Sequence, residues 1–315
     1  MQNLPQTAYK IPVYLTQERR CFYANIKVKL PFTCDESLFE EIYGVMDVVD
    51  RYYNSYTSGS YIDQINKNAG NWVDVDDTCV WLIQQLKNFA ELFDGIYDIT
   101  SMPLLKLWGF YDQKQNEIPT SAAIDTVLKK VDFRQIEIDG ERVRIAKGQE
   151  IITGSFLKSF AVDLAMDYIR DIGIKDALIN AGGSSMRVLN NYEHPHWKIK
   201  IPFLKRDDKE QLIRLSNKAF SYSGMGNNFK QIDGQKYSHI LNAKTGYPSA
   251  IRQVVIISNS SFEGDVLATA LYATGDDYEK YIPSIEAMGV SGFVVDSRGR
   301  KVNFGIPLEE EVLCS

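Results

Sequence analysis

Histidine and cysteine are scarce in this chain, and several features that often mark a protein's class are missing. The 315 residues include three histidines and four cysteines. The cysteines, Cys21, Cys34, Cys79 and Cys314, lie far apart and form no C-x-x-C pair. Cysteines scattered in this way argue against a disulfide framework and against a zinc site.

An excess of positive charge is also missing. The chain has 35 lysines and arginines against 41 aspartates and glutamates, for a net charge of −6. Proteins that bind nucleic acid need a basic surface for the phosphates, so we expect no nucleic-acid partner. Hydrophobic residues make up 44% of the chain, which is ordinary for a globular protein with a sizeable core.

Long hydrophobic runs are the third absence. No window approaches the roughly 20 apolar residues of a membrane-spanning helix. The first twenty residues contain neither the apolar stretch nor the small-residue cleavage site of a signal peptide. We therefore expect no membrane span and a cytoplasmic location, although an exported form with its leader removed would have the same pattern.

What is present alternates between strand and helix patterns. Apolar residues at every second position from Phe22 to Leu30 predict a strand. An apolar stripe at helical spacing predicts a helix that begins near Asp35, as its cap, and ends near Tyr53. The same reasoning predicts helices over 78–93, 122–131, 155–173, 265–274 and 278–288, and strands near 177–181, 197–201, 211–215 and 252–258.

Two segments have the pattern of β-hairpins. IEIDGERVRI predicts a hairpin with a type I′ turn at Asp139-Gly140, and GFVVDSRGRKVNF predicts a closing hairpin that turns at 297–299. Strand pairs with helices between them predict an α+β fold of mostly antiparallel sheets layered with helices. No linker rich in proline, glycine and serine divides the chain, so we expect an extension of residues 1–20 and one compact unit over 21–315.

Two segments in the middle of the chain are candidates for binding. In FDGIYDITSMPLLKLWGF, Asp98 and Thr100 lie among aromatic residues, either as a capped turn in a packed loop or as part of a pocket for a heterocyclic ligand. In TGSFLKSFAVD, Gly154 begins a helix whose first N–H groups favour anions, and Lys158 is either solvated or directed at a ligand. This segment lacks the G-x-x-x-x-G-K spacing of a P-loop.

Two later segments could hold a phosphate and a metal. YSHILNAKTGYP contains His239 and the turn Lys244-Thr245-Gly246, which is either an ordinary loop or a cation, a hydroxyl and a flexible backbone suited to a phosphate. In GDVLATALYATG, Asp265 and Thr269 lie four residues apart on one helical face. They are either a helix cap with a packed threonine, or hard oxygen ligands for Mg²⁺.

Taken together and in this order, these segments resemble the FAD:protein FMN transferases of the ApbE family. The resemblance spans about residues 20–305 and includes the strand end ALINAGGS, the turn SYSGMG and the loop SYTSGSYIDQIN. The family's G-G-x-A-K-G-x-A-x-D helix start corresponds to TGSFLKSFAVD, where Leu157 and Ser159 depart from the pattern. Asn242-Ala243 replaces the Asp-Pro of the family's H-I-x-D-P-x-T-G-x-P loop.

The resemblance implies Mg²⁺-dependent transfer of FMN from FAD to a threonine or serine of an acceptor flavoprotein, with release of AMP, on a T-fold-like duplication. It also implies a metal site, a candidate base and a set of contacts to the dinucleotide. The metal ligands would be Asp265, Thr269 and the carbonyl of Leu157; the base would be His239, or Asp265 through a bound water. The dinucleotide contacts would be Tyr97, Asp98, Ile99, Thr100, Gly154, Lys158, Asp163, Gly182, Gly183, His239, Thr245 and Gly246.

Two other functions remain open from the residues alone. A Mg²⁺-dependent FAD pyrophosphatase would use the same site, with water in place of the acceptor hydroxyl. A non-catalytic FAD-binding or storage protein would need the flavin contacts but no metal, and the Asp265 and Thr269 pair argues against it.

Overall fold

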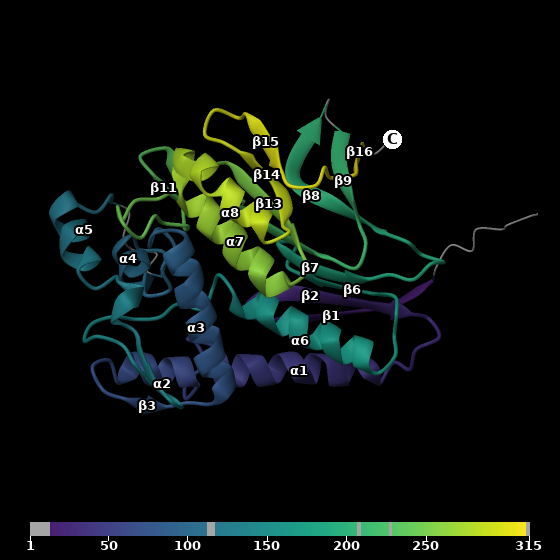
Figure 1. The fold of residues 1–315 in the computed structure, drawn as a ribbon, viewed down its shortest axis with the longest axis horizontal. Coiled ribbons are helices and arrows are strands. Elements are labelled where there is room, and N and C mark those ends of the chain that lie inside the picture. The colour runs from purple at the N-terminus through teal and green to yellow at the C-terminus, as the bar shows by residue number, and fades with distance from the viewer. Residues whose placement is uncertain (1–12, 112–116, 207–208, 227–228, 313–315) are drawn as a thin grey trace, which may run out of the picture.

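The computed structural model describes residues 13–111, 117–206, 209–226 and 229–312. An antiparallel sheet of eight strands runs through the molecule in the order β1-β2-β6-β7-β10-β13-β14-β15 (Figure 1). Its strands are β1 (Tyr14–Cys21), β2 (Ala24–Pro31), β6 (Ala177–Ala181), β7 (Ser185–Leu189), β10 (Ala219–Gly224), β13 (Gln253–Ser258), β14 (Ser291–Val295) and β15 (Lys301–Phe304).

The sheet consists of two halves with the same chain order. In the first half, β1 and β2 precede the helices α1 (Leu38–Tyr53) and α6 (Leu157–Asp171), and β6 and β7 follow them. In the second half, β10 and β13 precede α7 (Ser261–Ala273) and α8 (Ile282–Ala287), and β14 and β15 follow. The predicted α+β class of antiparallel strands layered with helices is confirmed, and the repeated order is the duplication that the resemblance implied.

Three further groups of elements are added to this frame. Between α1 and α6 lie α2 (Tyr61–Lys67), β3 (Val73–Asp74), α3 (Asp77–Leu92), α4 (Met102–Leu107), α5 (Ser121–Leu128), η1 (Phe133–Gln135), β4 (Glu137–Asp139) and β5 (Arg142–Arg144). A three-stranded sheet consists of β8 (Trp197–Arg206), β9 (Lys209–Leu215) and β16 (Glu310–Val312). The hairpin of β11 (Phe229–Ile232) and β12 (Gln235–Ser238) follows β10, and η2 (Gly275–Lys280) follows α7.

Side chains alternate between the two faces of the central sheet. In β13, Val254 and Ile256 point to the helices, whereas Val255 packs into a second cluster on the opposite face. Trp197 of β8 and Ile213 of β9 belong to that second cluster, so the small sheet covers the face that the helices leave. Successive side chains of a strand point to opposite faces of the sheet. Because both faces of this sheet are covered, its central strands are apolar at nearly every position.

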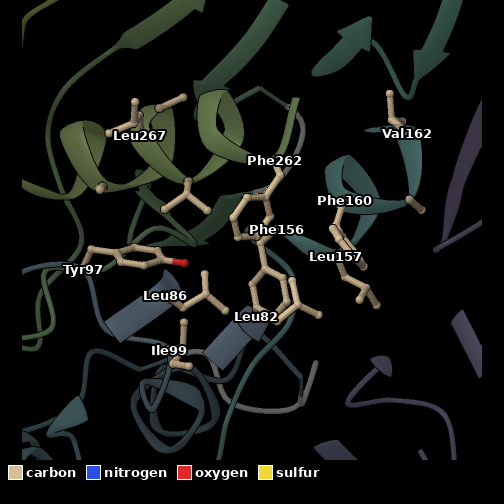
Figure 2. Packing of buried hydrophobic residues seen from close by; sticks show 14 of the residues in the cluster. Leu82, Leu86, Tyr97, Ile99, Phe156, Leu157, Phe160, Val162, Phe262 and Leu267 are labelled. Atoms are coloured by element: carbon tan, nitrogen blue, oxygen red, sulfur yellow. The ribbon is translucent and has the colours of Figure 1, made fainter. Parts of the chain in front are cut away.

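Aromatic rings join the starts of α6 and α7. The ring of Phe262 lies 6.2 Å from that of Phe156 and 6.1 Å from that of Phe160, centroid to centroid. Figure 2 shows these rings in the same buried cluster as Leu82 and Leu86 of α3. The contacts hold the beginnings of both helices in fixed relation, and the candidate site residues lie just after these beginnings.

The predicted helices are present, with corrections at their ends. Asp35 does not cap α1: Ser37 is the N-cap residue, and Asp35 Oδ1 accepts from its backbone N–H at 2.8 Å. The helix predicted over 265–274 begins at Ser261, because the side chain of Ser260 accepts from the backbone of Glu263 and caps it. The helix predicted over 278–288 is divided between η2 and α8.

The strands at the start of the chain differ from the sequence prediction. β1 occupies Tyr14–Cys21, so residues 14–20 of the predicted extension form the edge strand of the sheet, while residues 1–12 lie outside the described residues. In the hairpin of β4 and β5, Asp139 pairs with Arg142, so the loop is Gly140-Glu141 rather than Asp139-Gly140. Of these two loop residues only Gly140 has a positive φ, whereas a type I′ turn requires it at both.

No helix in the described part of the chain is long and apolar enough to cross a membrane.

Candidate functional site

A cavity of about 890 Å³ opens where the two halves of the sheet meet the long insertion. Its wall comes from segments far apart in the chain: residues 97–111 with α4, the start of α6, the turn after β6, the end of β10, the loop after β12, and α7. The volume lies in the range of roughly 300–1,000 Å³ that is typical of ligand pockets.

Most of the predicted site residues line this cavity. They are Tyr97, Asp98, Gly154, Lys158, Gly182, Gly183, His239, Asp265 and Thr269. All four segments that were candidates from the sequence are therefore brought together at one place.

Lys158 and Asp265 form the charged centre of the cavity. The Lys158 ammonium donates to Ser185 Oγ at 2.6 Å, to Ser184 Oγ at 2.9 Å and to the Ala181 carbonyl at 3.3 Å. Ser185 Oγ donates to Asp265 Oδ2 at 3.0 Å, and that oxygen lies 4.0 Å from Lys158 Nζ. Both charged side chains are largely withdrawn from water, with exposed fractions of 16% and 9%.

Burial acts against the charge of each partner. It lowers the pKa of Lys158, which the neighbouring carboxylate of Asp265 counteracts. It raises the pKa of Asp265, which Lys158 and the hydrogen bond from Ser185 counteract. Since a buried charge is stable only when it is paired, each of the two groups supports the charged form of the other.

Thr269 lies one helical turn after Asp265 on α7, and its Oγ1 is 3.4 Å from Ser223 Oγ of β10. A carboxylate and neighbouring hydroxyls are hard oxygen donors, and their chemistry fits Mg²⁺. Among the described residues, no three histidine, cysteine, aspartate or glutamate side chains gather into a metal site, so a metal here would depend on one carboxylate. Leu157 does not line the cavity; it is the first residue of α6, and its side chain is buried in the core.

The side chains of Asp98 and Thr100, in the Asp-x-Thr segment, form hydrogen bonds mainly with other groups of the protein. Asp98 Oδ1 accepts from the backbone N–H of Thr100 at 2.8 Å and from its hydroxyl at 2.7 Å, and Oδ2 accepts from the Phe133 N–H at 2.7 Å. Burial raises the pKa of Asp98 to about 6. Thr100 and Ile99 are fully buried and do not line the cavity, whereas the Tyr97 hydroxyl reaches it beside Ser155 Oγ at 2.9 Å.

Asp163 also lies outside the cavity wall and binds the start of α7. Its carboxylate accepts from Ser260 Oγ at 2.7 Å and from the backbone N–H groups of Ser261 at 2.8 Å and Phe262 at 2.9 Å. Arg187 donates to it at 2.7 Å. Asp163 thus caps one helix from another and fixes α7, which carries Asp265.

Thr245 and Gly246 lie in a turn and are not among the residues that line the cavity. Asn242 Oδ1 accepts from the N–H groups of Lys244 at 3.0 Å and Thr245 at 3.2 Å, so the amide performs the turn-forming role that an aspartate would have. Gly246 has a φ of +76°, and a Cβ there would lie 2.4 Å from a methyl of Ile124. Its carbonyl accepts from Trp108 Nε1 at 2.8 Å, which ties this turn to the aromatic loop.

His239 and the glycine pair lie on the cavity wall. The His239 ring stands edge-on to Phe110 with 6.5 Å between centroids. Gly182 and Gly183 have φ of +67° and +78°, and the Gly182 N–H donates to the Asn25 carbonyl at 3.0 Å. Two successive residues in this conformation turn the backbone along the cavity without side chains, which glycine alone does at low cost.

Sequence reasoning missed several hydroxyl groups in this wall. They belong to Ser155, Ser184, Tyr222 and Ser223, and to Ser185 behind them. Each is a direct neighbour in the sequence of a motif glycine or of another of these residues. This proximity to the motifs was the one sequence feature that could have identified them. The partner of each hydroxyl depends on the tertiary structure.

The duplicated antiparallel sheet, with a charged cavity between helices of its two halves, defines an α+β class distinct from the doubly wound parallel folds. The chain belongs to the ApbE family, whose model matches residues 7–289. It is 27% identical over 257 residues to a FAD:protein FMN transferase of Klebsiella pneumoniae, which covers 78% of each chain. It is 24% identical over 262 residues to the FAD:protein FMN transferase of Vibrio cholerae, covering 80% of this chain and 78% of that one.

The fold matches that of a solved relative. The crystal structure of the ApbE protein of Thermotoga maritima superposes with a TM-score of 0.85 at 26% identity, over 93% of this chain and 97% of that chain. The family resemblance that the motifs indicated is confirmed.

Proposed function

We propose that this chain transfers the FMN moiety of FAD to a threonine or serine hydroxyl of an acceptor flavoprotein, with Mg²⁺ as cofactor and AMP as the leaving group. The observation that carries the proposal is the buried pair of Lys158 and Asp265 in one cavity with His239 and Thr269. The names of the related transferases agree with it.

Phosphoryl transfer depends on neutralising the charge of the pyrophosphate and aligning the reacting groups more than on covalent catalysis by the protein. The acceptor oxygen forms a bond to the phosphorus on the riboflavin side, and the bond from that phosphorus to the AMP oxygen breaks. An imidazole nitrogen of His239 takes the hydroxyl proton, and the Lys158 ammonium supplies positive charge to the pyrophosphate. Asp265 and Thr269 would hold Mg²⁺, which would neutralise pyrophosphate charge when bound.

The first test weighs the acceptor. The purified protein is incubated with FAD, MgCl₂ and a candidate acceptor, and we expect an acceptor heavier by one FMN moiety minus water, together with AMP. His239→Ala should reduce the rate of transfer by about 10²–10⁴-fold and leave FAD binding little changed, because the base acts only as the transition state forms. His196→Ala, which changes a histidine outside the cavity wall, is the matched control.

Two other results would point to other functions. Rapid release of AMP and FMN beside an acceptor of unchanged mass would favour the pyrophosphatase. Tight FAD binding without either reaction would favour the binding protein.

A second test concerns the metal. Asp265→Ala should abolish Mg²⁺-dependent turnover and keep much of the flavin binding, because a divalent site with one carboxylate loses its main ligand. Asp277→Ala, at an exposed aspartate beyond the end of α7, should keep the wild-type rate. Turnover by Asp265→Ala at the wild-type rate would contradict the metal assignment.

A further inference from the structure

Ser185 lies between the two charged side chains of the cavity and belongs to no motif that the sequence singled out. It is the first residue of β7 and is fully buried. Its hydroxyl accepts from Lys158 Nζ at 2.6 Å and donates to Asp265 Oδ2 at 3.0 Å. Lys158 and Asp265 themselves remain 4.0 Å apart, too far for a direct hydrogen bond.

The direction of these hydrogen bonds follows from the groups involved. A lysine ammonium only donates, an ionised carboxylate only accepts, and a serine hydroxyl has one proton to give. Ser185 must therefore accept from Lys158 and give its single proton to Asp265. Both hydrogen bonds involve a charged partner, which makes them stronger than neutral ones.

The consequence for the cavity is a separation of charge. Without the hydroxyl, a buried ammonium and a carboxylate at this distance would close into a direct ion pair, since Ser184 and the Ala181 carbonyl contact the ammonium but do not bridge it to Asp265. A closed pair would occupy the carboxylate that a metal needs and the ammonium that a phosphate needs. Ser184 cannot replace Ser185 in this respect, because its hydroxyl accepts from Lys158 and does not bridge to Asp265.

We propose that Ser185 is a positioning residue. Its hydroxyl bridges Lys158 and Asp265 and keeps both side chains directed at the ligands of the cavity. The role of Ser185 in the reaction rests on the proposed function. Its effect on the binding of a divalent cation and of FAD can be measured without any transfer.

The test compares three variants of the full chain. Ser185→Ala removes the bridging hydroxyl, Ser185→Thr keeps it, and Ser221→Ala is the matched control. Ser221 is the direct cross-strand partner of Ser185 on β10 and is equally buried, but its hydroxyl contacts the Ser261 carbonyl instead. The readouts are the MgCl₂ concentration at the midpoint of the shift in melting temperature, without FAD, and the dissociation constant of FAD from fluorescence quenching, without metal.

We expect Ser185→Ala to raise the MgCl₂ midpoint by about 10–100-fold, the usual effect of losing a group that orients a metal ligand. FAD should bind less tightly in the same variant, and kcat should fall more than KM rises. Ser185→Thr should restore the MgCl₂ midpoint to within about threefold of the wild type, since the hydroxyl is retained. Ser221→Ala should match the wild type in every readout.

A MgCl₂ midpoint in Ser185→Ala equal to that of Ser221→Ala would overturn the proposal, and so would a wild-type protein that does not respond to MgCl₂. Failure of the wild type to modify any acceptor would contradict the proposed function alone, because the two binding measurements need no acceptor.

Discussion

At the scale of single residues, the cavity withdraws ionisable groups from water, and Asp98 is the case with the clearest effect on stability. Its carboxylate accepts three hydrogen bonds, and burial nevertheless raises its pKa to about 6. Because an exposed aspartate has a pKa of about 4, the folded protein holds this proton more tightly than the unfolded chain does. The resulting stability is present below pH 4 and is lost as the pH rises through 6.

We therefore expect the wild type to lose about 3 kcal/mol of unfolding free energy relative to Asp98→Asn between about pH 4 and pH 7. Denaturant unfolding of both proteins across this range measures the difference. Asp277→Asn, at an exposed position, should follow the wild-type curve. Parallel curves for wild type and Asp98→Asn would show that the folded state does not raise this pKa.

At the scale of elements, α7 depends on a cap that comes from another helix. Asp163 on α6 accepts three hydrogen bonds from the start of α7 and one from Arg187. Asp163→Ala should lower the unfolding free energy by about 3–5 kcal/mol, because it leaves two backbone N–H groups at the start of α7 without their acceptor and Arg187 with only the more exposed Asp167.

Asp167→Ala is the matched control for this change. Asp167 lies one turn further along α6 and is 41% exposed, at 3.3 Å from the same arginine. It should cost at most about 1 kcal/mol, as exposed ion pairs do. Equal losses for the two variants in denaturant unfolding would show that the charge of Arg187, and not the cap of α7, determines the stability.

The elements also show what periodicity can and cannot reveal. The regular patterns of α6 and β6 predicted both elements, because each has a long apolar face or a continuous buried run. β1 was missed because it is an edge strand whose residues are exposed or half-buried and mostly polar. The predicted start of α7, at Asp265 as a possible helix cap, is too late. Gly264 lies inside the helix, where a Cβ would lie 2.6 Å from Ser258 Oγ.

The site was predictable to a similar extent. Motif residues such as Lys158 and Asp265 reach the cavity, since their backbone positions follow from α6 and α7. Asp163 and Gly246 were chosen from the same motifs, but they serve a helix cap and a tight turn. The sequence cannot separate the two groups, because a carboxylate or a glycine has the same local pattern in either use.

At the scale of the whole molecule, the cavity wall draws on both halves of the sheet and on the insertion between α1 and α6. A ligand that spans the cavity therefore stabilises all three parts at once. FAD at about 100 times its dissociation constant should add about 2.7 kcal/mol to the unfolding free energy. FMN and riboflavin should bind less tightly than FAD, since they lack the contacts of the AMP half.

Melting temperatures and fluorescence quenching with the three flavins at equal concentration check this expectation. Equal shifts and equal affinities for FAD, FMN and riboflavin would show that the AMP half makes no contact with the cavity.

The duplicated sheet also bears on how such a protein could arise. Lys158 belongs to the second helix of the first half, and Asp265 to the first helix of the second half, so neither repeat contains the pair. A single-repeat ancestor would have needed two copies, side by side, to set a lysine of one against an aspartate of the other.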